Sequence, residues 1–408
     1  MYKRTILLSK DVLGKFYLPI YGNRYWKTPN IDELAAKGTI FQRHYTAAPS
    51  SSMSYYSMFT GQYPYESKIK SYRVLSQEER FTGETFFDKA RKRGYECHVV
   101  WEEAWMNDCK RFSECYGEQT VFHPLRGIKQ KVGVHAVNLE NIEPDPQKAE
   151  ETLKIIEECI AQICKAEHDI FVWMHLPHVW NGCTGYGADI DWFDRCVGML
   201  RKYFPDNELF ITADHGNMNG AHGKLGYAFD VYEEASSIPL ITPRIQGQAI
   251  VDYPTVNIDL FPLIFDRKII RREYVYSDSA YFAQSHRKLA IIHGRYKYIF
   301  SANKKKEELY DVEYDPHEWL NLMQDKLYDV DRGLTAKIRE MYFYPYWDIV
   351  FEERERMRKQ LQKIWRTPHG RDYARGVYEK WGKTIKRRYI VYRNRLMKRI
   401  SSLKRSKD

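Results

Sequence analysis

The segment ITADHGNMNGAHG (211–223) holds the pair of side chains best suited to chemistry, Asp214 and His215. An apolar run leads into them, so we expect them at the carboxyl end of a strand, where open α/β sheets bind their ligands. Neighbouring strand residues point to opposite faces, but leaving the strand at Gly216 lets both side chains turn toward one cation. By itself the pattern also fits a loop aspartate and histidine with no function.

Two further segments could complete a site around such a cation. In TAAPSSSMSYYSMFTGQYP (46–64), three serines precede a helical stretch, so a hydroxyl at the helix start would face the positive end of the helix dipole. The plainer interpretation of such a serine is an N-cap, but a cation that lowers the pKa of its hydroxyl would make it a nucleophile. After the first expected strand, Asp11 follows Ser9 and Lys10 and could add a carboxylate.

The elements that must position these residues alternate along the first 250 residues. Short apolar runs are followed by amphipathic stretches, and this alternation predicts an α/β fold with a doubly wound, mainly parallel sheet. The stretch that opens with Thr28-Pro29-Asn30 and stops at Gly38 is typical of a capped helix. We expect strands at 5–9, 39–45, 95–101, 168–176 and 207–214, and helices at 28–38, 53–60, 84–94, 146–166 and 190–203.

The character of the chain changes after residue 250. Short aromatic segments separated by turn residues predict a small C-terminal antiparallel sheet, and the chain after Leu334 is helical in pattern and basic. We therefore expect a catalytic α/β domain at 1–250, a small-sheet subdomain at 251–330 and a basic helical tail at 331–408.

The distribution of charge limits which partners the tail can bind, and the cysteine content indicates the cellular compartment. Residues 351–408 carry a net charge of +14, whereas residues 1–350 carry −4. Lys and Arg alternate there with apolar residues, which is typical of a solvated helix or a surface for anionic lipid; a nucleic-acid partner is the least favoured interpretation. Seven cysteines without a CxxC pair, and no signal-peptide or membrane-spanning pattern, favour the cytoplasm, with the tail able to hold the protein peripherally at a membrane.

Five segments in order resemble the sulfatase branch of the alkaline-phosphatase superfamily. TPNIDELAAKGTIFQRHYTAAP and SMFTGQYPYE are similar to the region around the family's nucleophile. DHGNMNGAHG, followed by VYEEASSIPLITP, is similar to its second signature. IIHGRYKYIF and EELYDVEYDPHEWLNL resemble its small C-terminal sheet, so the resemblance extends over residues 4–325.

The resemblance implies a nucleophile and a set of metal ligands. Ser51 falls on the family's nucleophile, and Asp11 falls on a metal-binding carboxylate after the first strand. Asp214 and His215 fall on a second pair of ligands, and Ser51 completes the set. Carboxylate, imidazole and hydroxyl ligands together favour a divalent Zn²⁺ or Mn²⁺ ion, whereas a set made only of oxygen atoms would favour Ca²⁺.

Two histidines and three departures from the family pattern bear on the reaction. The resemblance makes His178, in MHLPHVW, and His222, in AHG, candidate proton donors to the leaving oxygen.

Sulfatases convert their nucleophile to formylglycine where a proline and an arginine follow two and four residues later, but Met53 and Tyr55 stand at those places. Lys10 replaces one of two paired aspartates. An unmodified serine is more similar to the nucleophile of phosphoethanolamine and phosphoglycerol transferases.

The resemblance therefore implies a metal-dependent hydrolase or transferase that acts on phosphate or sulfate esters. Phosphoryl transfer through a covalent intermediate on Ser51 is favoured, with glycans or lipid-linked molecules as substrate classes. One alternative is a sulfuric ester hydrolase that uses an unmodified serine. The other is a catalytically inactive relative that serves as a binding module in polysaccharide assembly, against which the four retained ligands argue.

Overall fold

A computed structural model places an eight-stranded sheet at the centre of the protein. It describes residues 2–66, 81, 83–102, 117, 119–126, 146–177, 186–224, 226–279, 287–302, 306–323 and 346–366. The strand order is β10-β2-β9-β7-β1-β6-β4-β5. The strands are β1 (Arg4–Lys10), β2 (Thr39–Phe41), β4 (Glu96–Glu102), β5 (Val121–Leu125), β6 (Ile170–Leu176), β7 (Leu209–Ala213), β9 (Leu240–Thr242) and β10 (Ile250–Val251).

The middle of this sheet is parallel. β1 pairs in parallel with both β6 and β7, and β4 pairs in parallel with β5 and β6. Only β9 runs against its neighbours, β2 and β7. Because parallel strands all end at the same edge, residues that follow β1 and β7 are brought together although they lie far apart in the sequence.

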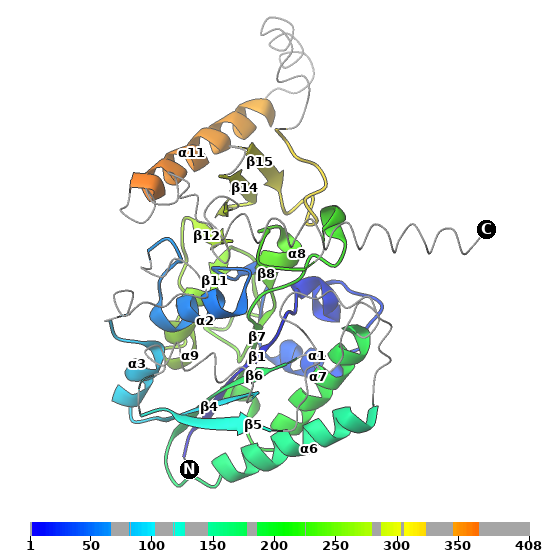
Figure 1. The fold of residues 1–408 in the computed structure, drawn as a ribbon, viewed down its shortest axis with the longest axis vertical. Helices are drawn as coiled ribbons and strands as arrows, with labels where there is room; N and C mark the ends of the chain where they lie inside the picture. The colour runs from blue at the N-terminus through cyan, green and yellow to red at the C-terminus, as the bar shows by residue number, and fades with distance from the viewer. Residues whose placement is uncertain are drawn as a thin grey trace, which may run out of the picture.

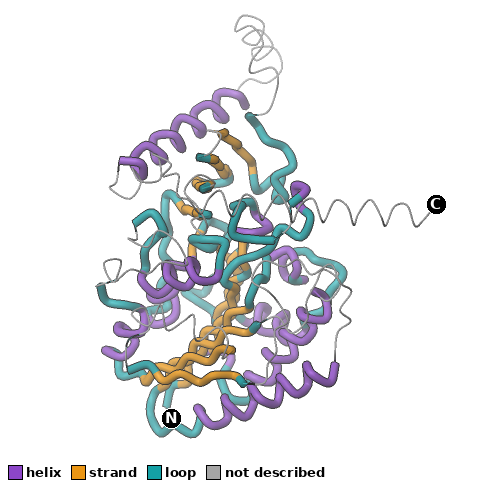
Figure 2. The backbone as a smooth tube through the Cα atoms, viewed as in Figure 1, coloured by secondary structure: helices purple, strands orange, loops and turns teal. Residues whose placement is uncertain are grey.

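Helices cover both faces of the sheet, and the alternation of strand side chains explains why. In β1, Ile6 and Leu8 enter one buried cluster with residues of α1 (Pro29–Lys37), α6 (Pro146–Ile163) and α7 (Tyr186–Leu200). Leu7 points the other way, into a cluster with α2 (Ser51–Thr60), α3 (Phe86–Lys92) and α9 (Leu260–Phe265). Figures 1 and 2 show these two groups of helices on either side of the strands. The predicted doubly wound α/β fold is confirmed.

Two smaller sheets complete the structure. Strands β11 (Thr255–Val256), β3 (His44–Tyr45) and β8 (Ser237–Ile238) form a three-stranded sheet. The predicted C-terminal antiparallel sheet is also confirmed, and its strands are β12 (Val275–Asp278), β13 (Lys288–His293), β14 (Tyr296–Ser301) and β15 (Lys306–Asp311).

Helix α11 (Tyr346–Arg366) packs on the C-terminal sheet. Val350, Met357 and Leu361 lie on one face of the helix and are buried in a cluster with residues of β13 and β14. Arg358 donates two hydrogen bonds, of 2.5 and 2.6 Å, to the Glu307 carboxylate on β15. The first part of the basic segment that begins at residue 351 is therefore a packed helix, and residues 367–408 lie outside the described part of the chain.

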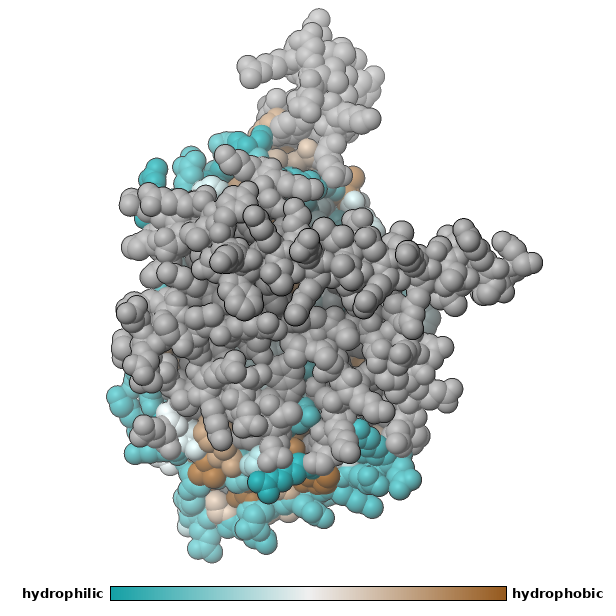
Figure 3. All heavy atoms as spheres, in the orientation of Figure 1, coloured by the Kyte–Doolittle hydropathy of each residue, from teal (hydrophilic) through white to brown (hydrophobic). Residues whose placement is uncertain are grey.

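No helix among the described residues is long and apolar enough to span a lipid bilayer. Where Figure 3 shows the described surface, it is mainly hydrophilic, with small apolar areas at its lower end.

The packing of α11 leads to a test by substitution. Met357 has no exposed surface, so Met357→Ala should lower the free energy of unfolding by about 2–5 kcal/mol through lost burial and a new cavity. Lys359→Ala, on the exposed side of the same helix, should change it by about 0.5 kcal/mol or less. Urea unfolding followed by circular dichroism measures both, and equal effects would contradict the packing described.

Candidate active site at the carboxyl ends of the strands

The register of three neighbouring strands brings an acidic and histidine-containing cluster together. Ser9 of β1 is level with His175 of β6, and Lys10 is level with Ala213 of β7. Asp11 and Asp214, which follow β1 and β7, therefore leave the sheet side by side. One ligand atom from each of Asp11, His175 and Asp214 lies within 4.8 Å of the others, so the three could bind one metal ion.

Backbone groups fix the Asp214 carboxylate. Its Oδ1 accepts hydrogen bonds from the N–H groups of Val12, at 2.9 Å, and His215, at 2.8 Å. Val12 has φ of 55°, a left-handed conformation that a β-branched residue rarely adopts, and its N–H points at Asp214 there. Asp214 Oδ2 is buried, accepts no hydrogen bond from the described residues, and lies 3.3 Å from His215 Nε2. A cation is the kind of partner that this oxygen lacks.

The same surroundings shift the pKa values of the Asp11 and Asp214 carboxyl groups in opposite directions. Burial, and then the negative charge of Asp214, raise the pKa of Asp11 well above its usual value. Burial also acts to raise the pKa of Asp214, but His215 and His175 outweigh it and hold that pKa below its usual value. Two adjacent carboxylates cannot both carry their charge cheaply without a cation between them. The residues present thus fit a divalent metal ion.

Ser51 is the first residue of α2, and its hydroxyl meets His215. The distance from Ser51 Oγ to His215 Nε2 is 3.1 Å. His215 Nδ1 lies 2.9 Å from the Gly216 carbonyl oxygen, which can only accept, so Nδ1 carries the proton. His215 Nε2 is therefore the ring nitrogen that faces both Ser51 Oγ and Asp214 Oδ2, at 3.1 and 3.3 Å.

The turn after His215 depends on glycine. A Cβ on Gly216 would lie 1.9 Å from the Glu234 carbonyl oxygen, so no side chain fits at this position. The close approach lets the chain leave β7 immediately and turn His215 toward Ser51.

A hydroxyl network that sequence reasoning missed joins the start of α2 to β7. Ser54 Oγ donates to the Asp214 carbonyl oxygen at 2.8 Å and accepts from Asn257 Nδ2 and Thr46 Oγ1, both at 2.9 Å. All three side chains are buried. This network sets the position of Ser51 relative to Asp214, and only the run of serines in the sequence hinted at it.

His175 is a second residue that sequence reasoning missed. Its Nδ1 lies 2.9 Å from Ser9 Oγ and 2.6 Å from the Tyr55 hydroxyl, while Trp101 packs edge-on at 4.8 Å between ring centroids. Tyr55 stands where the resembled family has an arginine, and here it orients a histidine instead. The available signal was a histidine near the carboxyl end of a strand next to β1.

The structure places the two candidate proton donors differently. His178 lies outside the described residues. His222 stacks on Tyr232, with 4.0 Å between ring centroids, and its Nε2 donates to the His317 carbonyl oxygen at 3.1 Å. These contacts connect His222 to α8 (Glu233–Ser236) and to the segment after β15, and not to Ser51.

Comparison with known proteins matches this arrangement to one family. The sequence model of the family described as Sulfatase matches residues 3–186. The choline-sulfatase of Rhizobium meliloti is 27% identical over 196 residues, which are 40% of this chain and 37% of that protein. Residues 3–186, a little under half of the chain, thus carry the sequence pattern of the sulfatase family. Since the match spans little more than a third of the choline-sulfatase, that enzyme's activity is not carried over with it.

Solved structures of sulfatase-family folds agree with the architecture. A 2-O GAG sulfatase superposes with a TM-score of 0.66 at 16% identity, over 90% of this chain and 93% of that one. The phosphonate monoester hydrolase of Agrobacterium radiobacter gives 0.57 at 16% identity, over 83% and 95%. At such identities the likeness concerns the fold.

Within this candidate site, Lys10 occupies a buried position that changes the ligand set. Its Nζ lies 2.8 Å from Asp189 Oδ2 on α7 and donates to the Pro177 carbonyl oxygen at 3.0 Å. The side chains of Lys10 and Asp189 are 2% and 3% exposed, so the pair is sealed from water. Only Asp11 is left from this end of β1 as a carboxylate ligand.

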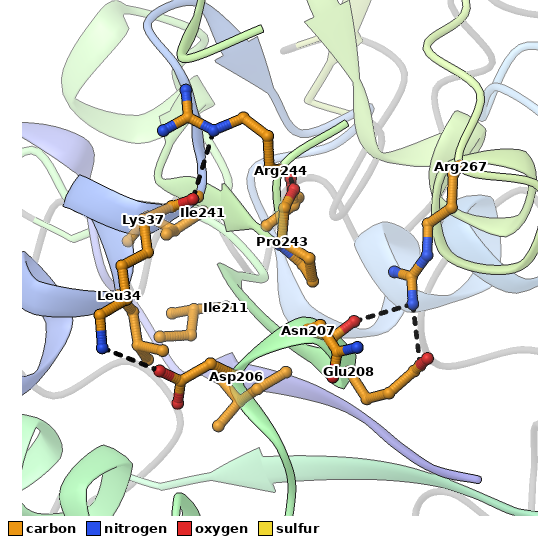
Figure 4. A pocket seen from close by; sticks show the side chains of 13 residues that line it. Leu34, Lys37, Asp206, Asn207, Glu208, Ile211, Ile241, Pro243, Arg244 and Arg267 are labelled. Atoms are coloured by element: carbon orange, nitrogen blue, oxygen red, sulfur yellow. Dashed lines mark hydrogen bonds and ion pairs between the residues drawn. The ribbon is translucent and has the colours of Figure 1, made fainter. Parts of the chain in front are cut away.

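The pocket drawn in Figure 4 lies away from this chemistry. It has a volume of about 420 Å³ and opens where β7 begins, at Leu209, whereas Asp214 follows the other end of that strand. Arg244 donates to the Lys37 carbonyl oxygen at 3.2 Å, and Arg267 donates to the Asn207 carbonyl oxygen at 2.9 Å. These cations are already bonded to the chain, and nothing in the pocket resembles a nucleophile with a base.

The contact between Tyr55 and His175 can be tested through metal affinity. Partners that orient a metal-binding histidine typically change affinity by about 10–100-fold, so Tyr55→Phe should weaken Zn²⁺ binding by that factor. Tyr63→Phe is the matched control, because the buried Tyr63 hydroxyl has no hydrogen-bond partner among the described residues. Competition with a chromophoric chelator measures both, and unchanged affinity in Tyr55→Phe would remove His175 from the ligand set.

Proposed function

We propose that this protein is a metal-dependent hydrolase or transferase that acts on phosphate or sulfate esters through a covalent intermediate on Ser51. The observation that carries this proposal is the 3.1 Å contact between Ser51 Oγ and His215 Nε2 beside the paired carboxylates of Asp11 and Asp214. The match of residues 3–186 to the sulfatase family supports it, since the family's members include proteins named for sulfate-ester hydrolysis.

Asp11, Asp214, His215 and Ser51 would hold the metal ion, with His175 as a further ligand. The mixture of imidazole nitrogen and oxygen atoms favours Zn²⁺ or Mn²⁺ over Ca²⁺. When bound, the ion lowers the pKa of the serine hydroxyl and stabilises charge on the transferred group. The strongest support for this assignment is the convergence of Asp11, His175 and Asp214, with Asp214 Oδ2 accepting no hydrogen bond from the described residues.

The side chains of this protein would supply the nucleophile, the proton donor to the leaving oxygen and the groups that hold the nucleophile in place. Ser51 Oγ would lose its proton to solvent and form the new bond to phosphorus or sulfur in line with the leaving oxygen, which departs as its bond to that atom breaks. His178 and His222 were the predicted proton donors, and since His222 Nε2 donates to the His317 carbonyl oxygen, His178 is the better candidate. The ester on Ser51 then passes to water or to an acceptor hydroxyl. Ser54 and Asn257 hold the nucleophile in place throughout.

Phosphoryl transfer is favoured over sulfate-ester hydrolysis because of the residues after Ser51. Met53 and Tyr55 replace the proline and arginine that formylglycine formation requires. Similarity in fold to a phosphonate monoester hydrolase is consistent with chemistry at phosphorus. Glycan or lipid-linked esters remain the proposed substrate classes, and the fold likeness to a GAG sulfatase is consistent with the former.

Two alternatives are separated from this proposal by simple observations. Detection of formylglycine at residue 51 by mass spectrometry would favour a sulfuric ester hydrolase. Absence of turnover on every ester tested, together with glycan binding, would favour an inactive binding module in polysaccharide assembly. Retention of Ser51, His215 and both carboxylates in one cluster supports the enzyme.

The decisive experiment removes the nucleophile. Ser51→Ala should abolish turnover of p-nitrophenyl phosphate, phosphodiester and sulfate esters tested with Zn²⁺ or Mn²⁺, while metal content stays close to that of the wild type because the other ligands remain. Ser52→Ala, the next residue of α2, is the matched control and should keep most of its activity. Turnover of Ser51→Ala within tenfold of the wild type would exclude Ser51 as the nucleophile.

A peripheral association with anionic membranes, in a cytoplasmic protein, is the proposed role of the basic tail. Since α11 packs on the C-terminal sheet, the charge available for such a surface lies in residues 367–408, which carry a net +11. Each Lys or Arg near an anionic bilayer contributes about 1 kcal/mol, an attraction that salt screens.

Vesicle sedimentation tests the tail. The full chain should sediment with phosphatidylserine vesicles at low salt and return to the supernatant at high salt. A shortened chain ending at Arg366, which keeps the whole of α11, should stay in the supernatant at both salt concentrations. Equal sedimentation of the two chains would show that residues 367–408 do not bind the membrane.

A further inference from the structure

A second cluster of ligand-type side chains lies outside the Ser51 site. His222, Glu234 and Glu318 each place one ligand atom within 4.8 Å of the others. They come from three separate parts of the chain: the segment after Asp214-His215, helix α8, and the segment after β15. The three residues do not belong to one sequence motif, and neither glutamate is part of the Ser51 site.

Glu234 supplies an oxygen that has no partner. The residue is only 8% exposed, and its Oε2 is buried without a hydrogen bond among the described residues. Oε2 faces His222, whose Nε2 lies 3.9 Å away, too far for a hydrogen bond. The other oxygen, Oε1, lies 3.0 Å from His317 Nδ1. Leaving a buried carboxylate oxygen unpaired costs free energy unless a further ligand occupies the space in front of it.

Glu318 is a buried carboxyl group at the edge of a second group of charged side chains. It is 1% exposed, its Oε1 lies 3.2 Å from Lys297 Nζ, and its Oε2 accepts a hydrogen bond from the Glu233 N–H at 2.5 Å. Lys297 is shared with Glu233, at 2.9 Å, and Lys15 also pairs with Glu233, at 3.6 Å. Glu233 and Glu318 thus share two ammonium groups, whereas the ion pairs of Glu234 among the described residues are with His222 and His317.

The backbone and the neighbouring rings hold His222 toward the two glutamates. His222 has φ of 53°, a left-handed conformation that is strained for a residue other than glycine, between Gly220 and Gly223, which are also left-handed. Its ring lies between Tyr232, at 4.0 Å and 10° between planes, and Trp319, at 5.2 Å and 24°. The imidazole is therefore fixed before any ligand binds.

We propose that His222, Glu234 and Glu318 form a second divalent-cation site, suited to Zn²⁺. One imidazole and two carboxylates, with no thiolate, make a nitrogen and oxygen set that first-row divalent ions bind. The His317 carbonyl oxygen, which accepts a hydrogen bond from His222 Nε2, lies beside these three and offers a fourth ligand atom once an ion displaces that proton. An ion here ties the segment behind His215 to α8 and to the segment after β15.

Metal counting on the full-length protein tests the site separately from the Ser51 site. Protein stripped with a chelator is dialysed against micromolar Zn²⁺ and its metal is measured by elemental analysis. Glu234→Gln should bind one equivalent less than the wild type. Asp214→Asn should also bind less, through the first site, and the double variant should lose both contributions. His293→Gln is the matched control, because it removes a histidine paired with Glu353, at 2.7 Å, outside any cluster of three ligands.

Thermal unfolding gives a second readout. In the Asp214→Asn background, Zn²⁺ should raise Tm, and adding Glu234→Gln should remove that rise. His222→Gln, which leaves both carboxylates in place, should do the same and covers the case in which Glu234→Gln fails to fold. Equal metal content in Glu234→Gln, His222→Gln and wild type would overturn the proposal, as would binding that appears only at millimolar Zn²⁺. Unchanged metal content in Asp214→Asn alone would instead count against the first site.

Discussion

The organisation of the candidate site depends on the repulsion between two neighbouring carboxylates and on the groups that offset it. Parallel pairing of β1 with β7 forces Asp11 and Asp214 to leave the sheet side by side, and burial prevents water from screening them. Several groups near the carboxyl ends of the strands interact with the Asp214 carboxylate. Two histidines lower the pKa of Asp214, two N–H groups bind its Oδ1, and the strained backbone of Val12 is what brings one of those groups into range.

The same charge explains why a serine there can react. A hydroxyl at the start of α2 already faces the positive end of the helix dipole, but that alone makes a cap and not a nucleophile. In the proposed reaction the difference would come from a bound metal ion and from His215, whose Nδ1 donates to the Gly216 carbonyl and whose Nε2 faces Ser51. The position of Ser51 is set by Ser54 and its buried hydrogen bonds. The residues that would activate Ser51 therefore differ from those that position it.

Much of this could be predicted from sequence, for physical reasons that differ between parts. Apolar runs alternating with amphipathic stretches define a doubly wound sheet, because both faces of its strands must be covered. Asp11, Ser51, Asp214 and His215 stood out because each lies at the end of a strand or the start of a helix. His175 did not, because a histidine inside an apolar strand has no periodicity that separates a ligand from a packed ring. Nor could the packing of α11 be predicted, since its charged residues hide the spacing of Met357 and Leu361.

The buried pair of Lys10 and Asp189 makes two distant positions depend on each other. Exchanging Lys10 for an aspartate would add a fourth carboxylate to Asp11, Asp214 and Asp189, while exchanging Asp189 first would remove the carboxylate that pairs with the Lys10 ammonium group. Breaking such a pair from either side typically costs about 3–5 kcal/mol. Neither single exchange is therefore neutral, and a lysine and an aspartate at these two places are exchanged with least cost when both change together. The residues available at the end of β1 for the proposed metal site thus depend on a helix that contributes no proposed ligand.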